Sequence, residues 1–200
     1  MKARNRWWSK VIGMGLLMGG TVMYPAAQSN PGDKKEKEQV REAYAASAMV
    51  RAGGRSTMMT VTIHIDGFSP DAEVLGLAET LRDQGSEALL KAMGKLKAKG
   101  RLAPTGHIGT DIRVIRSRPT EKGGRRVILV TDRPITFAEL RQGSRSRDYE
   151  FGIIQLDLDE HGKGEGALLA AAKIKFNDDN TIEFEHYGID PVRLMNVRKM

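Results

Sequence analysis

Residues 156–166, LDLDEHGKGEG, hold the pattern that decides the fold. Leu156 and Leu158 end one stretch in which apolar and polar residues alternate, and a second apolar stretch follows the glycines. Alternation with a period of two is typical of a strand with one buried face. Glycines spaced by two supply the positive φ angles that a bulged turn needs. The pattern therefore predicts a β-hairpin between strands at 151–158 and 167–176.

The same stretch also suggests a calcium loop. Asp157 and Asp159 occupy the first and third positions of an EF-type loop, and a glycine stands at the sixth. The fifth position, however, is His161, and the twelfth is Leu168 in place of the bidentate glutamate. A looser calcium site would combine Asp157, Asp159 and Glu165 with backbone carbonyls, so we keep this metal site as the weaker alternative to a plain hairpin.

The strand pattern continues from the hairpin in both directions along the chain. Further strands are predicted at 59–65, 108–116, 126–131, 181–187 and 192–197. The short connections between them favour antiparallel neighbours.

Two consecutive helices are predicted between the first of these strands and the rest. Ser69 and Pro70 are residues that favour a helix start, and Gly85 can close the helix in a left-handed conformation. Ser86 then caps a second helix, which Gly100 ends. The predicted fold is α+β: an antiparallel β-meander or partly open barrel of about seven strands, with a helical hairpin inserted after the first strand. We expect the hairpin to pack across one face of the sheet or to plug an open barrel end.

Residues 1–29 have the three-part organisation of a secretory signal peptide. Four positive charges and no negative charge precede an apolar run at 11–24, which Pro25 ends. The run is shorter than the roughly 18 residues needed to span a bilayer. We predict cleavage after Ser29, with Ala27 as the second choice. The expected location is the periplasm or the outside of the cell, with no transmembrane span after cleavage.

Composition limits the partners of the exported chain. The net charge of +7 falls to +3 once the four lysines and arginines of the signal peptide are removed, so no nucleic-acid partner is predicted. The absence of cysteine excludes disulfides, thiol nucleophiles and cysteine-based metal sites. Residues 30–55 are polar and rich in charge and alanine, which predicts a linker, partly helical or disordered. Residues 56–200 form the single predicted α+β domain.

Two further groups of polar residues are candidate sites. His64 and Asp66 share one face of a predicted strand and could share a proton or a metal ion, although a solvent-facing strand end explains them as well. Four arginines on two successive strands would gather at one sheet end as an anion site for phosphate or acidic polysaccharide. They are Arg113, Arg116, Arg125 and Arg126. Their alternative role is solubilising charge among neighbouring acids.

Residues 61–197 resemble a family of small bacterial proteins that carry secretion signals and have no assigned function. The stretches that carry the resemblance are VTIHIDGFS, GGRRVILVTDRPITFAE, LDLDEHGKGEG and DPVRLMNVR. The resemblance implies one compact domain behind a signal peptide and assigns no site residue.

The sequence thus favours an exported, non-enzymatic domain that binds an envelope or extracellular ligand or is associated with the envelope. One alternative is a secreted hydrolase that uses His64 and Asp66 or a metal-supported loop. Another is a carrier of a small apolar ligand held between the helices and the sheet. No cofactor is predicted, and the sequence does not indicate the oligomeric state.

Overall fold

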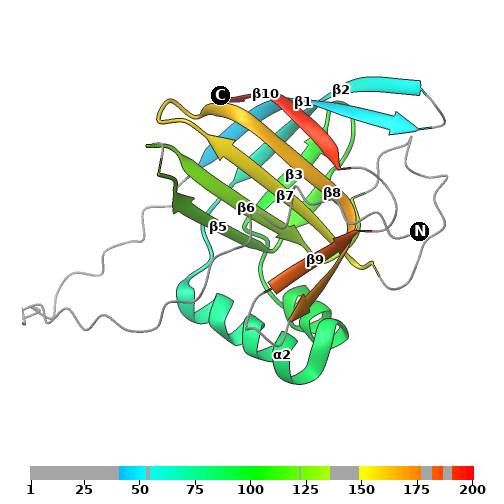
Figure 1. Cartoon of the computed structure of the whole chain (residues 1–200), viewed down its shortest axis with the longest axis vertical. Coiled ribbons are helices and arrows are strands. Elements are labelled where there is room, and N and C mark those ends of the chain that lie inside the picture. Colours follow the sequence, from blue (N-terminus) through cyan, green and yellow to red (C-terminus); the bar gives the residue numbers. More distant parts are fainter. Residues whose placement is uncertain (1–40, 53–54, 122, 136–148, 177–181, 187–190) are drawn as a thin grey trace, which may run out of the picture.

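The computed structural model describes residues 41–52, 55–121, 123–135, 149–176, 182–186 and 191–200 (Figure 1). The predicted signal peptide and residues 30–40 lie outside these ranges. No helix in the described ranges is long and apolar enough to cross a bilayer.

The described elements are ten strands and one helical element. In chain order they are β1 (Glu42–Ala52), β2 (Arg55–Ile65), α2 (Asp71–Gly94), β3 (Gly100–Pro104), β4 (Thr110–Ile112), β5 (Val114–Pro119), β6 (Arg125–Thr131), β7 (Phe151–Leu158), β8 (Lys163–Phe176), β9 (Ile182–His186) and β10 (Val192–Lys199).

The strands form one antiparallel sheet that curls into a nearly closed barrel (Figure 1). Its order is β4-β3-β2-β1-β10-β8-β7-β6-β5, and β9 pairs with β8 beside this path. The two end strands, β4 and β5, are separated along the chain by Arg113 alone. The backbone N–H of Arg113 donates to the carbonyl of Val130 at 3.0 Å, which holds the end of β4 beside β6.

The prediction of an antiparallel, barrel-like α+β fold is confirmed, whereas the predicted count of about seven strands is too low. Three differences account for the larger number of strands. Strands β1 and β3 were not predicted, and the expected strand at 108–116 is interrupted at Arg113, where β4 ends and β5 begins.

The predicted linker at 30–55 is wrong for residues 42–52, which form β1 near the middle of the sheet order. Strand β1 pairs with β2 along its whole length and with β10 on its other side. Its inward positions are Tyr44, Ala46, Ala48 and Val50, which are all buried. Three of the residues beside them are also small, namely Ala43, Ala45 and Ser47. The alternation of inward and outward positions is therefore hard to recognise in the sequence.

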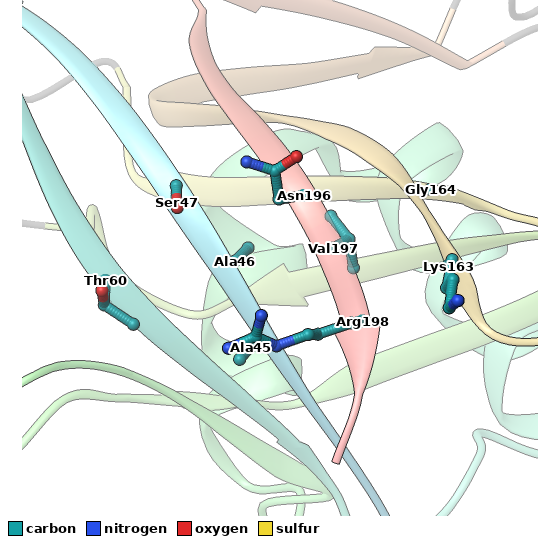
Figure 2. A pocket seen from close by; sticks show the side chains of 9 residues that line it. All are labelled: Ala45, Ala46, Ser47, Thr60, Lys163, Gly164, Asn196, Val197 and Arg198. Carbon is teal, nitrogen blue, oxygen red and sulfur yellow. The ribbon is translucent and has the colours of Figure 1, made fainter.

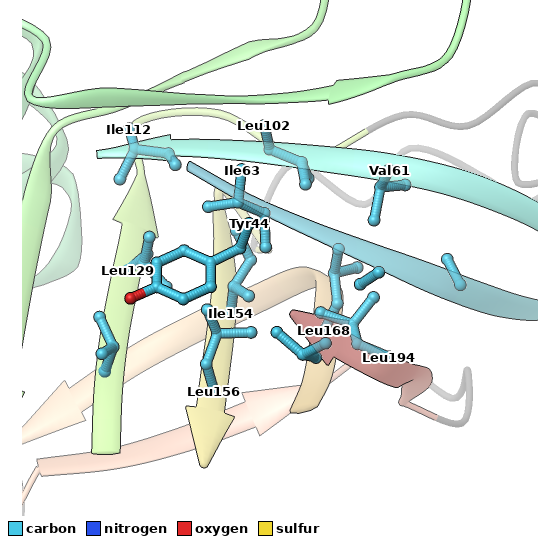
Figure 3. Close-up of a cluster of buried hydrophobic side chains, with 14 of the residues drawn as sticks. Tyr44, Val61, Ile63, Leu102, Ile112, Leu129, Ile154, Leu156, Leu168 and Leu194 are labelled. Atoms are coloured by element: carbon cyan, nitrogen blue, oxygen red, sulfur yellow. The ribbon is translucent and has the colours of Figure 1, made fainter. Parts of the chain in front are cut away.

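The barrel interior is filled by apolar side chains (Figure 3). Alternate residues of the strands point inward and pack on one another. Residues 0% exposed in this cluster include Ile63 of β2, Leu129 of β6, Ile154 of β7 and Leu194 of β10. The core is therefore closed by side chains that come from strands far apart in sequence.

The helical element α2 packs on the outer face of the sheet and does not plug a barrel end. It breaks at Gly85, where φ is +82°, so the predicted division into two helices at this glycine is confirmed. Leu81, Leu89 and Met93 pack against outward-facing residues of β5 to β8 such as Phe151. Because β1 precedes β2, the helices follow the second strand of the sheet and not the first.

The start and end of α2 differ in detail from the prediction. Pro70 is the N-cap residue and makes no side-chain capping bond. The hydroxyl of Ser69 instead accepts the backbone N–H of Ile115 at 3.2 Å, which ties the helix start to β5. The helix ends at Gly94 and not at Gly100, which belongs to β3 and pairs with Ile65.

Candidate functional site

The first candidate pair, His64 and Asp66, lies at the end of β2 with both side chains exposed. The neighbours of His64 across the sheet are Ala43 of β1 and Arg101 of β3. Arg101 is already paired with Asp111 at 3.0 Å. Among the described residues, the pair is not part of a group of three or more acidic or histidine side chains that could hold a metal ion.

The LDLDEHGKGEG stretch forms the predicted hairpin, with β7 and β8 joined by a tight turn. The Asp159 carboxylate accepts the backbone N–H groups of His161 and Lys163 at 2.9 and 2.8 Å. These hydrogen bonds lower the pKa of Asp159 below its ordinary value, and the bond from Lys163 has the largest effect. Gly162 has a φ of +73° and supplies the left-handed residue of the turn. The Asp159 carboxylate thus has a structural role in the turn, through its Oδ1 atom.

The other two calcium candidates lie on the neighbouring rungs of the hairpin. Asp157 and Glu165 are directly opposite each other in the β7–β8 register. Asp157 pairs with Arg126 at 2.5 Å and accepts the side-chain amide of Gln155 at 2.8 Å. Among the residues that the structure describes, no three acidic or histidine side chains gather as a metal site. The three candidates are therefore not assembled around a common centre.

Each of the four candidate arginines has its own carboxylate partner. Arg113 pairs with Asp132 at 3.0 Å, Arg116 with Asp71 at 2.5 Å, Arg125 with Glu42 at 2.7 Å and Arg126 with Asp157 at 2.5 Å. Two of them also donate to backbone carbonyls, of Leu96 and Ser69. The predicted arginine anion site does not form as one cluster, because these guanidinium groups hold separate parts of the fold together.

One of these pairs belongs to a larger polar group at one end of the barrel, which we call the barrel-end cluster. It consists of Glu42, Tyr44, Arg125 and Lys199. The Glu42 side chain is 9% exposed; it accepts the Tyr44 hydroxyl at 3.0 Å and lies 2.7 Å from Arg125 and 3.7 Å from Lys199. Arg125 also donates to the Tyr44 hydroxyl. Burial, followed by the charge of Glu42, raises the pKa of Tyr44. Every charge in this cluster has a counter-charge.

A second, unpredicted feature lies on the outer face of β1, β2, β8 and β10, and we call it the outer depression (Figure 2). It has a volume of 560 Å³ and is open to solvent. Its lining residues are Ala45, Ala46, Ser47, Thr60, Lys163, Gly164, Asn196, Val197 and Arg198. The depression forms because β1 contributes small side chains here and β8 contributes a glycine.

A bulge in β10 shapes the outer depression. The register of β10 shifts against β1 between Ala45 and Ser47, and against β8 between Leu194 and Val197. Asn196 lies inside both shifts and has a φ of +53°, the one positive φ of a non-glycine residue in the described ranges. Asparagine tolerates this left-handed conformation better than most residues. The bulge therefore turns the Asn196 side chain out beside the depression, as Figure 2 shows.

Two cations and no acid line the outer depression. Lys163 and Arg198 are direct neighbours across the β8–β10 register, and both are exposed. In Figure 2 the Arg198 side chain extends over β1 toward Ala45, whereas Lys163 stays over β8. The charge of Lys163 contributes to the lowered pKa of Asp159, but Asp159 already holds two backbone amides. Within the described ranges, neither cation forms an ion pair.

The residues that β1 contributes to both features were not predicted as site residues, for a common reason. Glu42, Tyr44, Ala45 and Ser47 stand in the segment that was interpreted as a linker. Recognition of the buried alternation from Tyr44 to Val50 as a strand would have placed them in the sheet. Comparison of the chain with known protein families, curated proteins and solved structures found no match in any of the three.

Proposed function

We propose that this chain is an exported, non-enzymatic domain that binds its ligand on the outer face of the barrel, at the outer depression. The observation that carries the proposal is the contrast between a filled interior and a hollowed exterior. Side chains such as Ile63, Leu129 and Ile154 are 0% exposed inside the barrel, whereas the depression on β1, β8 and β10 is open and lined by polar and cationic groups (Figures 2 and 3).

The arrangement gives less support to the two alternatives. A hydrolase needs a base, a nucleophile and a stabilising group within hydrogen-bond reach of one reacting atom. His64 and Asp66 are exposed at a strand end, and in the described ranges they belong to no group of three metal-ligand side chains. A carrier of an apolar ligand needs space between α2 and the sheet, but Leu81, Leu89 and Met93 pack directly into that region.

Export is the part of the proposal that rests on residues 1–29. The test is expression of the full chain, with its own leader, in a bacterium that has a periplasm. We expect the periplasmic protein to have the intact mass of a chain that begins at Asn30, or at Gln28 if cleavage follows Ala27. A chain of full-length mass that stays in the cytoplasm would contradict export.

Binding is tested on the exported protein by native mass spectrometry, followed by thermal melting with a panel of envelope polysaccharides and anions. The proposal predicts either a retained ligand or a raised melting temperature with at least one member of the panel. A ligand-free spectrum together with unchanged melting across the panel would contradict it. Hydrolysis of a model ester or glycoside that the His64→Ala variant abolishes would favour the hydrolase instead.

A further inference from the structure

We infer that the outer depression, which Lys163 and Arg198 line, binds an oxyanion, a carboxylate or a phosphate group. The inference rests on the proposed function for the existence of a ligand and adds the chemistry of its recognition. It differs from the arginine site predicted at 113–126, whose four guanidinium groups are already occupied by Asp and Glu partners.

The first argument is the unbalanced charge. Like charges directly opposite each other on neighbouring strands destabilise a sheet. Lys163 and Arg198 occupy such a pair of positions, and no carboxylate lines the depression beside them. An anion bound in the depression would be attracted by both positive charges and would weaken this repulsion. Binding would therefore be strongest for a ligand with concentrated negative charge.

The second argument is the set of neutral hydrogen-bonding groups beside the cations. Ser47 of β1 and Thr60 of β2 are register partners, and both residues line the depression. The Asn196 side chain stands on the other side, where the bulge turns it outward. Hydroxyl and amide groups donate to oxyanions and also bind sugar hydroxyls. The donors are thus spread over a wider area than one small ion covers.

The third argument is size. A volume of 560 Å³ lies within the range of small-molecule sites and exceeds what a single inorganic ion fills. The site is open rather than enclosed, so a ligand unit can belong to a longer chain that continues over the surface. Two sources of the oxyanion fit: the carboxylate of a uronic-acid saccharide and a phosphate group.

The test is a titration of the exported protein, followed by NMR or calorimetry, with two probes in separate arms. The probes are inorganic phosphate and a short oligogalacturonate. We expect binding that weakens as salt is raised, since the cations are exposed. Replacement of one cation, Lys163→Gln or Arg198→Gln, should weaken binding about fivefold, and the double variant about twentyfold.

The matched control is Arg193→Gln. Arg193 is an exposed arginine on the same strand, but it lies outside the depression, opposite Met49 and Ala167. Its replacement removes the same charge and should change the affinity by less than about twofold, because long-range attraction between exposed charges is screened. A preference for oligogalacturonate over phosphate would identify a carboxylate ligand, and the reverse preference would identify a phosphate ligand.

Two results would overturn the inference: equal loss of affinity in Arg193→Gln and in the double variant, or no binding of either probe by the wild-type chain. The second result leaves the proposed function standing if native mass spectrometry shows another ligand retained. Failure of the proposed function itself would appear as a protein that retains no ligand and responds to none in the panel.

Discussion

The barrel-end cluster and the outer depression contain the same kinds of charged residue in opposite arrangements. At the barrel end, Arg125 and Lys199 share the nearly buried Glu42, and the Tyr44 hydroxyl completes the network. At the outer depression, Lys163 and Arg198 stand opposite each other with no acid lining the site. The first arrangement provides partners for the Glu42 carboxylate, which the fold nearly removes from water. The second leaves charges available to solvent and to a ligand. Cations with a carboxylate partner are therefore structural, and cations without one are the candidates for a function.

The largest effect is expected when the barrel-end cluster loses its acid. Glu42→Leu leaves Arg125 and Lys199 without their shared counter-charge, and breaking a buried ion pair is strongly destabilising. Because Arg125 is partly exposed, we expect a loss of about 3 kcal/mol in the free energy of unfolding. Urea denaturation followed by circular dichroism measures it. As a control, Asp83→Ala, which breaks the exposed Arg82–Asp83 pair, should leave the midpoint unchanged. Equal midpoints for the two variants would refute the structural role of Glu42.

The next effect concerns the bulge that shapes the outer depression. Asn196→Val places a β-branched residue at a φ of +53° and should cost about 2 kcal/mol of stability. Asn196→Gly tolerates the same φ and should stay close to the wild type, although it removes the side-chain amide. Thermal or urea unfolding of both variants measures the difference. Equal stability of the valine and glycine variants would mean that the left-handed conformation at this position is not required.

Alkaline pH should weaken the barrel-end cluster. The pKa of Tyr44 is raised above its ordinary value near 10, so the folded state keeps the phenol protonated where the unfolded state ionises. Its contribution to stability is full below pH 10 and is lost as the pH rises through the folded-state pKa. Tyr44→Phe should cost about 1 kcal/mol at neutral pH, through the lost hydrogen bond. It should also flatten the fall in stability above pH 10. Parallel pH profiles for the variant and the wild type would contradict this assignment.

The smallest stability effect is expected at the rim of the outer depression. The double variant Lys163→Gln and Arg198→Gln should stay within about 0.5 kcal/mol of the wild type, because neither side chain forms an ion pair in the described ranges. Any change should be a gain, since two like charges across neighbouring strands are removed. Urea unfolding beside Glu42→Leu provides the measurement. A loss comparable to that of Glu42→Leu would show that these cations stabilise the fold.

The sequence predicts the part of the fold where apolar residues alternate with clearly polar ones. The hairpin at 151–176 and the antiparallel barrel follow from that signal, and the break at Gly85 follows from the glycine itself. Strand β1 does not, because Ala45, Ala46 and Ala48 fit either face and also suit a helix. A charge-rich stretch stands just before this strand, so composition made the whole segment resemble a linker.

The candidate sites were harder to predict than the strands, because side-chain pairing is a property of the sheet register. Arg125 seemed free in the sequence, yet its partner Glu42 comes from the far end of the described chain. Lys163 and Arg198 seemed unrelated, yet β10 places them side by side. Clustering of arginines along the chain was therefore a poor guide to a free positive surface.

The pairing of β1 with β10 has a consequence for the timing of folding. The barrel is completed only when the last strand inserts between β1 and β8, so its central contacts join the two ends of the described chain. Sheets dominated by such distant contacts fold slowly. Under the export that we propose, this late closure would keep the chain unfolded, as passage through a narrow translocation channel requires, until its C-terminal strand is in place.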